Sequence, residues 1–416
     1  MGKKNTLLKQ LRTVAVIAAL TLTAANTAAQ SKYFGAVNSD GKMIYYEITS
    51  VKDPYAVEVT FWDGTKKYYY EGDINIPETV SYNGITYTVT GIGLEAFRLN
   101  GDLTSVTIPE TITYIKNDAF IECHSLKSIF IPNTVTSIGT RAFGNCGAAE
   151  SIKLPDSMTK IPASLLRNCE SLKSIDIPEG VTEIGMNAFE GCKTPIYIAI
   201  PETVKVIQGG GFKWMTSLVS VTIPEGVTEI NNKAFGYCES LKTVDYNAVS
   251  CITDAYSYTS PVFEESNGLT ILNIGDKVTS IPDYMFKGCK FKEIRSRNAV
   301  APVVSDNAFD DYTATLYVPK GSKSSYQSKG KWGNFNIVET DFSSIEETAS
   351  ETDGITAVIS GEHLVISGAD NSTPVNIYNP SGILVQSTTV ATAADIDLPD
   401  GVLIISVAGK TFKVIK

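Results

Sequence analysis

Cysteine is the residue type in this sequence whose spacing most clearly suggests chemistry. Six of the seven cysteines recur at one fixed interval, at twice that interval, or at the equivalent place in a later copy of the same pattern: Cys123, Cys146, Cys169, Cys192, Cys238 and Cys289. Regularly spaced thiols in an exported protein favour disulfides, and Cys-x-x-Cys pairs favour a metal. The sequence has no such pairs, and Met215 stands where the series skips a member. A place that accepts methionine is apolar, so we predict a ladder of buried thiols, with disulfides as the alternative.

Residues for other kinds of catalysis do not form a set. The chain has two histidines, His124 and His363, which lie in different parts of the sequence and do not accompany a nucleophile. The glycine run from Gly209 to Gly211 lacks the following Lys-Ser/Thr of a phosphate-binding loop. We therefore expect no enzymatic activity, no metal and no cofactor.

The beginning of the chain, up to Ala29, has the pattern of a secretory signal peptide. Four basic residues up to Arg12 precede an apolar run from Val14 to Leu22, and the small residues that follow end at Ala29. This run is shorter than the roughly 20 apolar residues that a membrane span needs, so no transmembrane segment is expected. The first cysteine is Cys123, so we also expect no lipid anchor at the cleaved N-terminus.

The charge balance excludes one class of partner. Removing the four basic residues of the signal peptide changes the formal net charge from −10 to −14. Such an acidic chain lacks the basic surface that nucleic acids or anionic lipids require. We therefore expect no nucleic-acid binding.

A short repeat organises most of the chain. Ile-Pro or Leu-Pro pairs end at equally spaced prolines: Pro109, Pro132, Pro155, Pro178, Pro201 and Pro224. Alignment on an aromatic position of the same pattern extends the series to ten copies, at Phe97, Phe120, Phe143, Leu166, Phe189, Phe212, Phe235, Phe263, Phe286 and Phe309. A period of about 23 residues is the signature of a solenoid, in which each copy buries its apolar face only against its neighbours.

Within one copy, the spacing predicts which side chains face inwards. Ile129 and Ile131 alternate with Ser128 and Phe130, so the first pair should point to the core and the second to solvent. A proline ends this strand, and a short helical turn is expected around Phe143. At about 4.8 Å per coil, ten coils should form a rod or arc of roughly 50 Å. Two insertions are expected on the surface: a hairpin at Asn83-Gly84, and a loop at Asp254 to Tyr258.

The repeat resembles a known family. The pattern I-P-x-x-V-T-x-I-G-x-x-A-F-x-x-C-x-S-L-x-S-I, which recurs between Ile74 and Glu339, is similar to the BspA-type (Treponema-type) leucine-rich repeats of bacterial surface proteins. The resemblance implies a β-rich solenoid: a leucine-rich repeat array of about ten 23-residue coils in residues 74–314. Residues 30–73 would be an N-terminal β cap, and residues 315–338 would close the array as its C-terminal cap.

The end of the chain has a different composition. Residues 339–353 are acidic and rich in serine and threonine, as expected for a linker. Residues 354–416 contain five short apolar or alternating runs between turn residues, which predict a small all-β sandwich. Its segments around Asn379-Pro380 and Asp397 to Val402 resemble the C-terminal sorting domains of the type IX secretion system. Leu403 stands where that family usually has an aromatic residue, which leaves a purely structural domain as the alternative.

The outward positions of the strands are the part of each copy that varies, so they predict the binding site. One column contains Thr107, Phe130, Lys153, Asp176, Thr222 and Asp245, and a neighbouring column contains Tyr197. Exposed aromatic residues on a sheet are typical anchors for proteins or sugars. We therefore predict an adhesin-like protein, secreted or displayed outside the outer membrane of a Gram-negative bacterium, that binds an extracellular matrix or bacterial surface protein. A glycan-binding module and an architectural spacer without a ligand are the alternatives.

Overall fold

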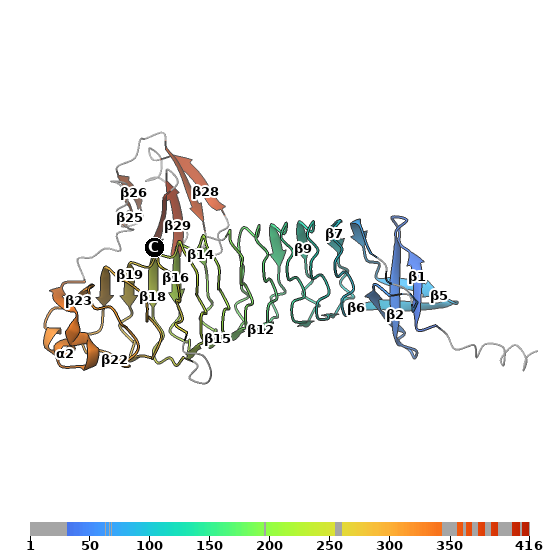
Figure 1. The fold of residues 1–416 in the computed structure, drawn as a ribbon. Helices are drawn as coiled ribbons and strands as arrows, with labels where there is room; N and C mark the ends of the chain where they lie inside the picture. Colours follow the sequence, from blue (N-terminus) through green and yellow to red (C-terminus); the bar gives the residue numbers. More distant parts are fainter. Residues whose placement is uncertain are drawn as a thin grey trace, which may run out of the picture.

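The computed structural model describes residues 31–62, 64–65, 67, 69–194, 197–253 and 260–342, together with six strands that follow residue 355. The predicted signal peptide, the insertion at Asp254 to Tyr258 and most of the predicted linker lie outside the described residues. The repeated copies form the predicted β-rich solenoid, an elongated array of stacked coils (Figure 1).

One long face of the solenoid, which we call the strand face, is built from the predicted strands. Ser128 and Phe130 are exposed and Ile129 and Ile131 are buried, which confirms the predicted alternation. The strands pair in parallel in two sheets, with the orders β11-β9-β7-β4 and β14-β16-β18-β19-β21-β23-β24. Their bounds are β4 Gly72–Asn75, β7 Leu103–Thr107, β9 Ser128–Phe130, β11 Ser151–Lys153, β14 Tyr197–Ile198, β16 Ser220–Ile223, β18 Thr243–Tyr246, β19 Ile271–Ile274, β21 Glu293–Ser296, β23 Thr315–Pro319 and β24 Asn336–Thr340.

A second strand in most coils was not predicted. It follows the proline turn, where the pattern V-T-x-I pairs with the same residues of the next coil, as Ile184 does with Ile207. Only two residues of each coil take part, too few to show a period of two in the sequence. These strands are β8 Tyr114–Ile115, β10 Ser137–Ile138, β12 Lys160–Ile161, β13 Glu183–Ile184, β15 Val206–Ile207, β17 Glu229–Ile230, β20 Ser280–Ile281 and β22 Val303–Val304.

The corner that carries the phenylalanines is not the helical turn that we predicted. In the first coil, Glu95 and Leu99 have left-handed φ values of 56° and 63°, which interrupt a right-handed helix. The Phe97 N–H donates to the Ala119 carbonyl of the next coil at 2.7 Å, whereas the Arg98 N–H donates to the Glu95 carbonyl within its own turn at 3.0 Å. Backbone donors of this corner therefore alternate between the neighbouring coil and the local turn, and the corner helps to join the coils.

Buried aromatic rings and thiols form the core between these faces. Consecutive phenylalanine rings stack along the array, for example Phe97 on Phe120 at 4.8 Å between centroids and Phe212 on Phe235 at 5.1 Å. All seven cysteines are free and buried, which confirms the predicted thiol ladder. Five of the thiols are tied to the coil before them, as the Cys146 thiol is when it donates to the Phe120 carbonyl at 3.2 Å.

The N-terminal end is covered by a mixed unit of strands, antiparallel except for the parallel pairing of β3 with β6, and its last strand leads into the array. The predicted hairpin is confirmed: β5 and β6 pair around Asn83 and Gly84, both at positive φ as a tight hairpin requires. The buried Glu58 carboxylate accepts hydrogen bonds from Lys116 and Tyr114, both at 2.9 Å, and so fixes the unit to the second coil. The strands are β1 Tyr33–Val37, β2 Met43–Ser50, β3 Ala56–Thr60, β5 Thr79–Tyr82 and β6 Ile85–Ile92.

The other end of the array is closed by two short helical segments between the last two parallel strands. They are α2, Lys323–Gln327, and η1, Gly330–Asn334. Tyr326 and Trp332 from these segments are fully buried. The Trp332 indole N–H donates to the Pro302 carbonyl at 2.9 Å, so this aromatic pair covers the exposed end of the core.

The C-terminal residues form two antiparallel sheets. The five runs identified in the sequence each overlap a strand, and a sixth strand at the end of the chain was not predicted. One sheet has two strands and the other has the order β28-β27-β29-β30. The strands are β25 Thr356–Ser360, β26 His363–Ser367, β27 Pro374–Tyr378, β28 Leu384–Thr389, β29 Val402–Val407 and β30 Lys410–Ile415.

Candidate functional site

The predicted site residues belong to successive coils of the strand face. Parallel pairing places Phe130 of β9 beside Lys153 of β11, and the Ser105–Ser128 pairing of β7 with β9 places Thr107 on the opposite side of Phe130. Asp176 belongs to the next coil, at an exposed position outside any assigned strand. The structure therefore brings four of the predicted residues together as consecutive rungs.

Phe130 is the large apolar residue of this group. Its side chain is 61% exposed, in a column whose neighbouring members are polar or charged. A phenylalanine ring held on a sheet loses little conformational freedom when a partner covers it, so its burial contributes directly to binding. This residue is the best candidate for an anchor on the strand face.

Lys153 is not an isolated cation. Its ammonium group donates to Asp156 at 2.9 Å and to Asp176 at 3.4 Å. The hydrogen bond with Asp156, followed by the charge of Asp176, raises the pKa of Lys153, and the same bond lowers the pKa of Asp156. Asp156 also accepts from the Asn133 amide at 3.1 Å. The positive and negative side chains thus form one partly neutralised cluster beside Phe130.

The remaining predicted residues lie further along the face. Thr222 of β16 and Asp245 of β18 are half-buried and hydrogen-bonded to each other at 3.3 Å, and Asn273 of β19 donates to Asp245 at 2.8 Å. The Tyr197 backbone pairs with Ser220, but its side chain lies outside the described residues. The structure therefore separates the prediction into an exposed group around Phe130 and a more buried polar ladder.

A pair of stacked aromatic rings was not predicted from the sequence. Trp214 and Tyr237 lie in consecutive coils at the end of the phenylalanine corner, with ring centroids 4.3 Å apart and planes 13° apart. The Lys213 ammonium lies 5.6 Å from the Tyr237 ring centroid. Earlier coils have the polar residues Glu122 and Asn145 at this position of the repeat. The change to aromatic residues at the same position was the signal that the sequence offered.

The described residues also bear on metal binding and membrane insertion. In this part of the chain, no group of three histidine, cysteine, aspartate or glutamate residues is arranged to hold a metal ion. None of the described helices has the length and apolar character needed to cross a membrane.

Comparisons with known proteins agree with the repeat pattern. The model of the BspA type leucine-rich repeat region matches residues 90–208 and 195–315, which together span more than half of the 416 residues. Comparison with curated protein sequences gives no match.

Among solved structures, a leucine-rich cell surface protein from Faecalibacterium prausnitzii is 21% identical, with a TM-score of 0.43, and the match covers 74% of this chain and 95% of that one. A leucine-rich repeat protein from Bacteroides ovatus is 18% identical, with a TM-score of 0.36 and coverage of 72% and 98%. The pneumococcal vaccine antigen PcpA is 16% identical, with a TM-score of 0.34 and coverage of 74% and 99%. The family match, and the ten coils that carry its pattern, establish that this chain belongs to the BspA-type leucine-rich repeat family.

Proposed function

We propose that this protein is displayed outside the cell and binds an extracellular protein through the strand face. The observation that carries the proposal is Phe130, a large apolar side chain that is 61% exposed on a rigid sheet. Binding sites for proteins concentrate their affinity in a few aromatic and charged residues surrounded by polar groups. Phe130 would be the anchor, and Lys153 and Asp176 would form part of its polar surroundings.

The shape of the face favours a protein over a sugar at this position. Phe130 stands on an open strand with a charged cluster on one side and Thr107 on the other, and it has no second aromatic residue beside it in its column. Sugar sites use several coplanar rings or a concave pocket, whereas protein partners cover single exposed anchors on flat surfaces. An architectural spacer would gain nothing from an exposed phenylalanine at this position.

The proposed location rests on the two ends of the sequence. Residues 1–29 have the charge and hydropathy pattern of a cleaved signal peptide, and residues 354–416 resemble sorting domains that direct export across the outer membrane. Export to the exterior of a Gram-negative bacterium would expose the strand face to host matrix and to other bacterial surfaces.

The binding proposal is tested by removing the anchor. Purified protein is passed over immobilised host matrix proteins and bacterial surface proteins, and the affinities of Phe130→Ala and of the double variant with Tyr197→Ala are compared with wild type. Truncation of a central aromatic anchor should cost about 2 kcal/mol, which is about thirtyfold in affinity. The melting temperature should stay unchanged because Phe130 is exposed.

Trp214→Ala is the matched control, because it removes a partly exposed aromatic residue outside the strand face. Its affinity should equal that of wild type. If Phe130→Ala binds as tightly as wild type, or if no matrix or bacterial surface protein binds at all, the proposed use of this face is wrong.

A further inference from the structure

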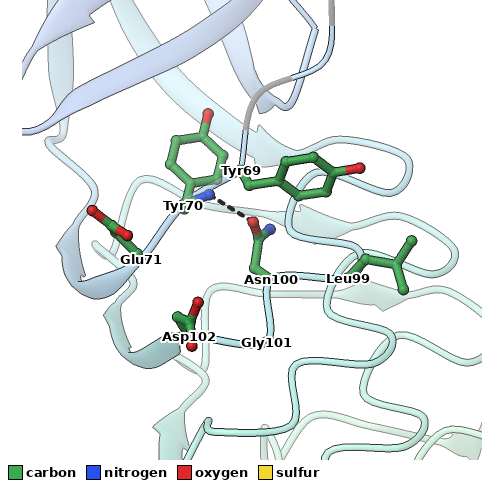
Figure 2. A pocket seen from close by; sticks show the side chains of 7 residues that line it. All are labelled: Tyr69, Tyr70, Glu71, Leu99, Asn100, Gly101 and Asp102. Atoms are coloured by element: carbon green, nitrogen blue, oxygen red, sulfur yellow. Dashed lines mark hydrogen bonds between the residues drawn. The ribbon is translucent and has the colours of Figure 1, made fainter.

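A surface hollow lies where the N-terminal unit meets the first coil of the array (Figure 2). Its volume is about 340 Å³, and its walls come from two short segments, Tyr69 to Glu71 just before β4 and Leu99 to Asp102 just before β7. We call it the Asn100 hollow, because Asn100 lies at its centre in Figure 2. No residue of the strand-face proposal takes part in it.

Asn100 occupies the place that cysteine has in the following coils. In five of those coils the thiol donates to the carbonyl of the residue at the phenylalanine position in the coil before, as Cys123 does to Phe97 at 3.0 Å. Asn100 belongs to the first coil, so no earlier coil offers such a carbonyl. Its Oδ1 accepts from the Tyr70 N–H at 2.6 Å, while Nδ2 has no hydrogen-bond acceptor among the described residues.

A polar residue at this place can be fully satisfied, as a later coil shows. Ser266 occupies the same position; its hydroxyl accepts from the Cys238 N–H at 3.0 Å and donates to the Phe235 carbonyl at 2.7 Å. Asn100 is only 1% exposed, yet one of its two polar side-chain atoms has no partner among the described residues. A buried donor without an acceptor is unfavourable, so this nitrogen points to an oxygen that the described part of the chain does not supply.

The other residues that line the hollow indicate which further chemical groups a ligand with such an oxygen would have. The Asn100 nitrogen lies on the side of Tyr69 and Leu99 (Figure 2), whose side chains are 65% and 47% exposed. Leu99 differs from the next three coils, which have Glu122, Asn145 and Asn168 at the equivalent place. Glu71 and Asp102 line the other side with exposed carboxylates, which accept hydrogen bonds.

We infer that the Asn100 hollow binds one unit of an uncharged saccharide. A sugar ring has an apolar face that would pack on Tyr69 and Leu99, an oxygen that would accept from the Asn100 amide, and hydroxyls that would donate to Glu71 and Asp102. A few polar groups around an aromatic wall are typical of small-ligand sites. A basic peptide is less well matched, because the Lys42 ammonium already lies beside this segment, 3.3 Å from the Glu71 carbonyl oxygen.

The inference is tested with the full exported chain on an array of neutral oligosaccharides built from hexoses and N-acetylhexosamines, with lysine-rich peptides printed beside them. We expect binding to a subset of the oligosaccharides, confirmed by titration in solution. Tyr69→Ala should weaken that binding at least about tenfold, because it removes the stacking surface. Tyr69→Phe keeps the ring and should bind nearly as wild type.

Asn100→Ser removes the unpaired donor and should also weaken saccharide binding, with its melting curve recorded to show that the chain is folded. Phe130→Ala is the control on the strand face and should leave saccharide binding unchanged, so failure of this inference is distinguishable from failure of the proposed protein-binding face. The inference is overturned if no oligosaccharide binds at millimolar concentration, if Tyr69→Ala binds oligosaccharides as wild type, or if the Tyr69-dependent ligands are the lysine-rich peptides.

Discussion

Replacing Phe189 by alanine is the sharpest test of how the array is held together. Phe189 is fully buried in a central coil, with the Phe212 ring 5.4 Å away on one side. The preceding coil has Leu166 at this place, so Phe189 begins a stack of phenylalanines that continues towards the C-terminal cap. Truncation of a buried phenylalanine costs about 3 to 5 kcal/mol, because the transfer of the ring from water is lost and a cavity remains. Loss of the ring contact with Phe212 contributes about 1 kcal/mol of this.

The physical arrangement predicts how this loss will appear. In a linear stack each coil touches only its neighbours, so weakening one interface can uncouple the two halves of the array. Urea unfolding followed by circular dichroism should therefore show a lower first midpoint and a broader or divided transition. Limited proteolysis should cut near the mutated coil before the remaining coils are degraded.

Phe130→Ala provides the control, since it removes the same side chain from an exposed position of the same array. Its unfolding free energy should change by no more than about 0.5 kcal/mol. If Phe189→Ala unfolds at the same urea concentration as wild type, or no differently from Phe130→Ala, the phenylalanine stack does not stabilise the array and the reasoning is wrong.

Burial raises the pKa of the Cys123 and Cys238 thiols from 9.0 to about 12, so the folded state disfavours their ionisation. The contribution of these two thiols to stability should be constant below pH 9 and fall as the pH rises from there towards 12. A thiol reagent at pH 8 should label all seven cysteines only after denaturation, and disulfide-linked peptides from the native protein would contradict this. Lys116→Met removes the charged partner of the buried Glu58 carboxylate and leaves the Tyr114 hydrogen bond, so it should lower the unfolding free energy by about 1 to 3 kcal/mol. Lys173→Met at an exposed ion pair should have little effect, and equal unfolding curves for the two variants would argue against the N-terminal attachment. Deletion of residues 354–416 should leave binding by the purified protein intact but hold the protein in the periplasm, and its appearance on the cell surface would exclude a sorting role.

Much of the fold could be predicted from the sequence, because the repeat places the same residue types in the same surroundings many times. The inward Ile129 and outward Phe130 follow from alternation along a strand, and the buried cysteines follow from the methionine that replaces one of them. The hairpin at Asn83-Gly84 follows from local turn chemistry. Each of these features depends on one coil or one turn, so a short stretch of residues is enough to predict it.

Some contacts between coils could be predicted from the sequence and others could not. Lys153 and Asp176 are one repeat apart, so once the period is known they are neighbours, although the additional contact with Asp156 appears only in the structure. The short second strands have too few residues for a sequence period, and the left-handed residues of the corner reflect bonding to the adjacent coil rather than local preference.

The solenoid, its period and its inward and outward side chains could be predicted from the residues alone, because every internal coil packs between two coils of similar sequence. The contacts at the ends of the array, where a coil lacks one of its two neighbours, became visible only in three dimensions. Glu58 of the N-terminal unit meets Lys116 of the second coil, and Asn100 lacks the preceding-coil carbonyl that thiols such as Cys123 bond. The end of a stack exposes groups that every internal coil satisfies, and their partners come from a part of the chain with no repeat to predict them.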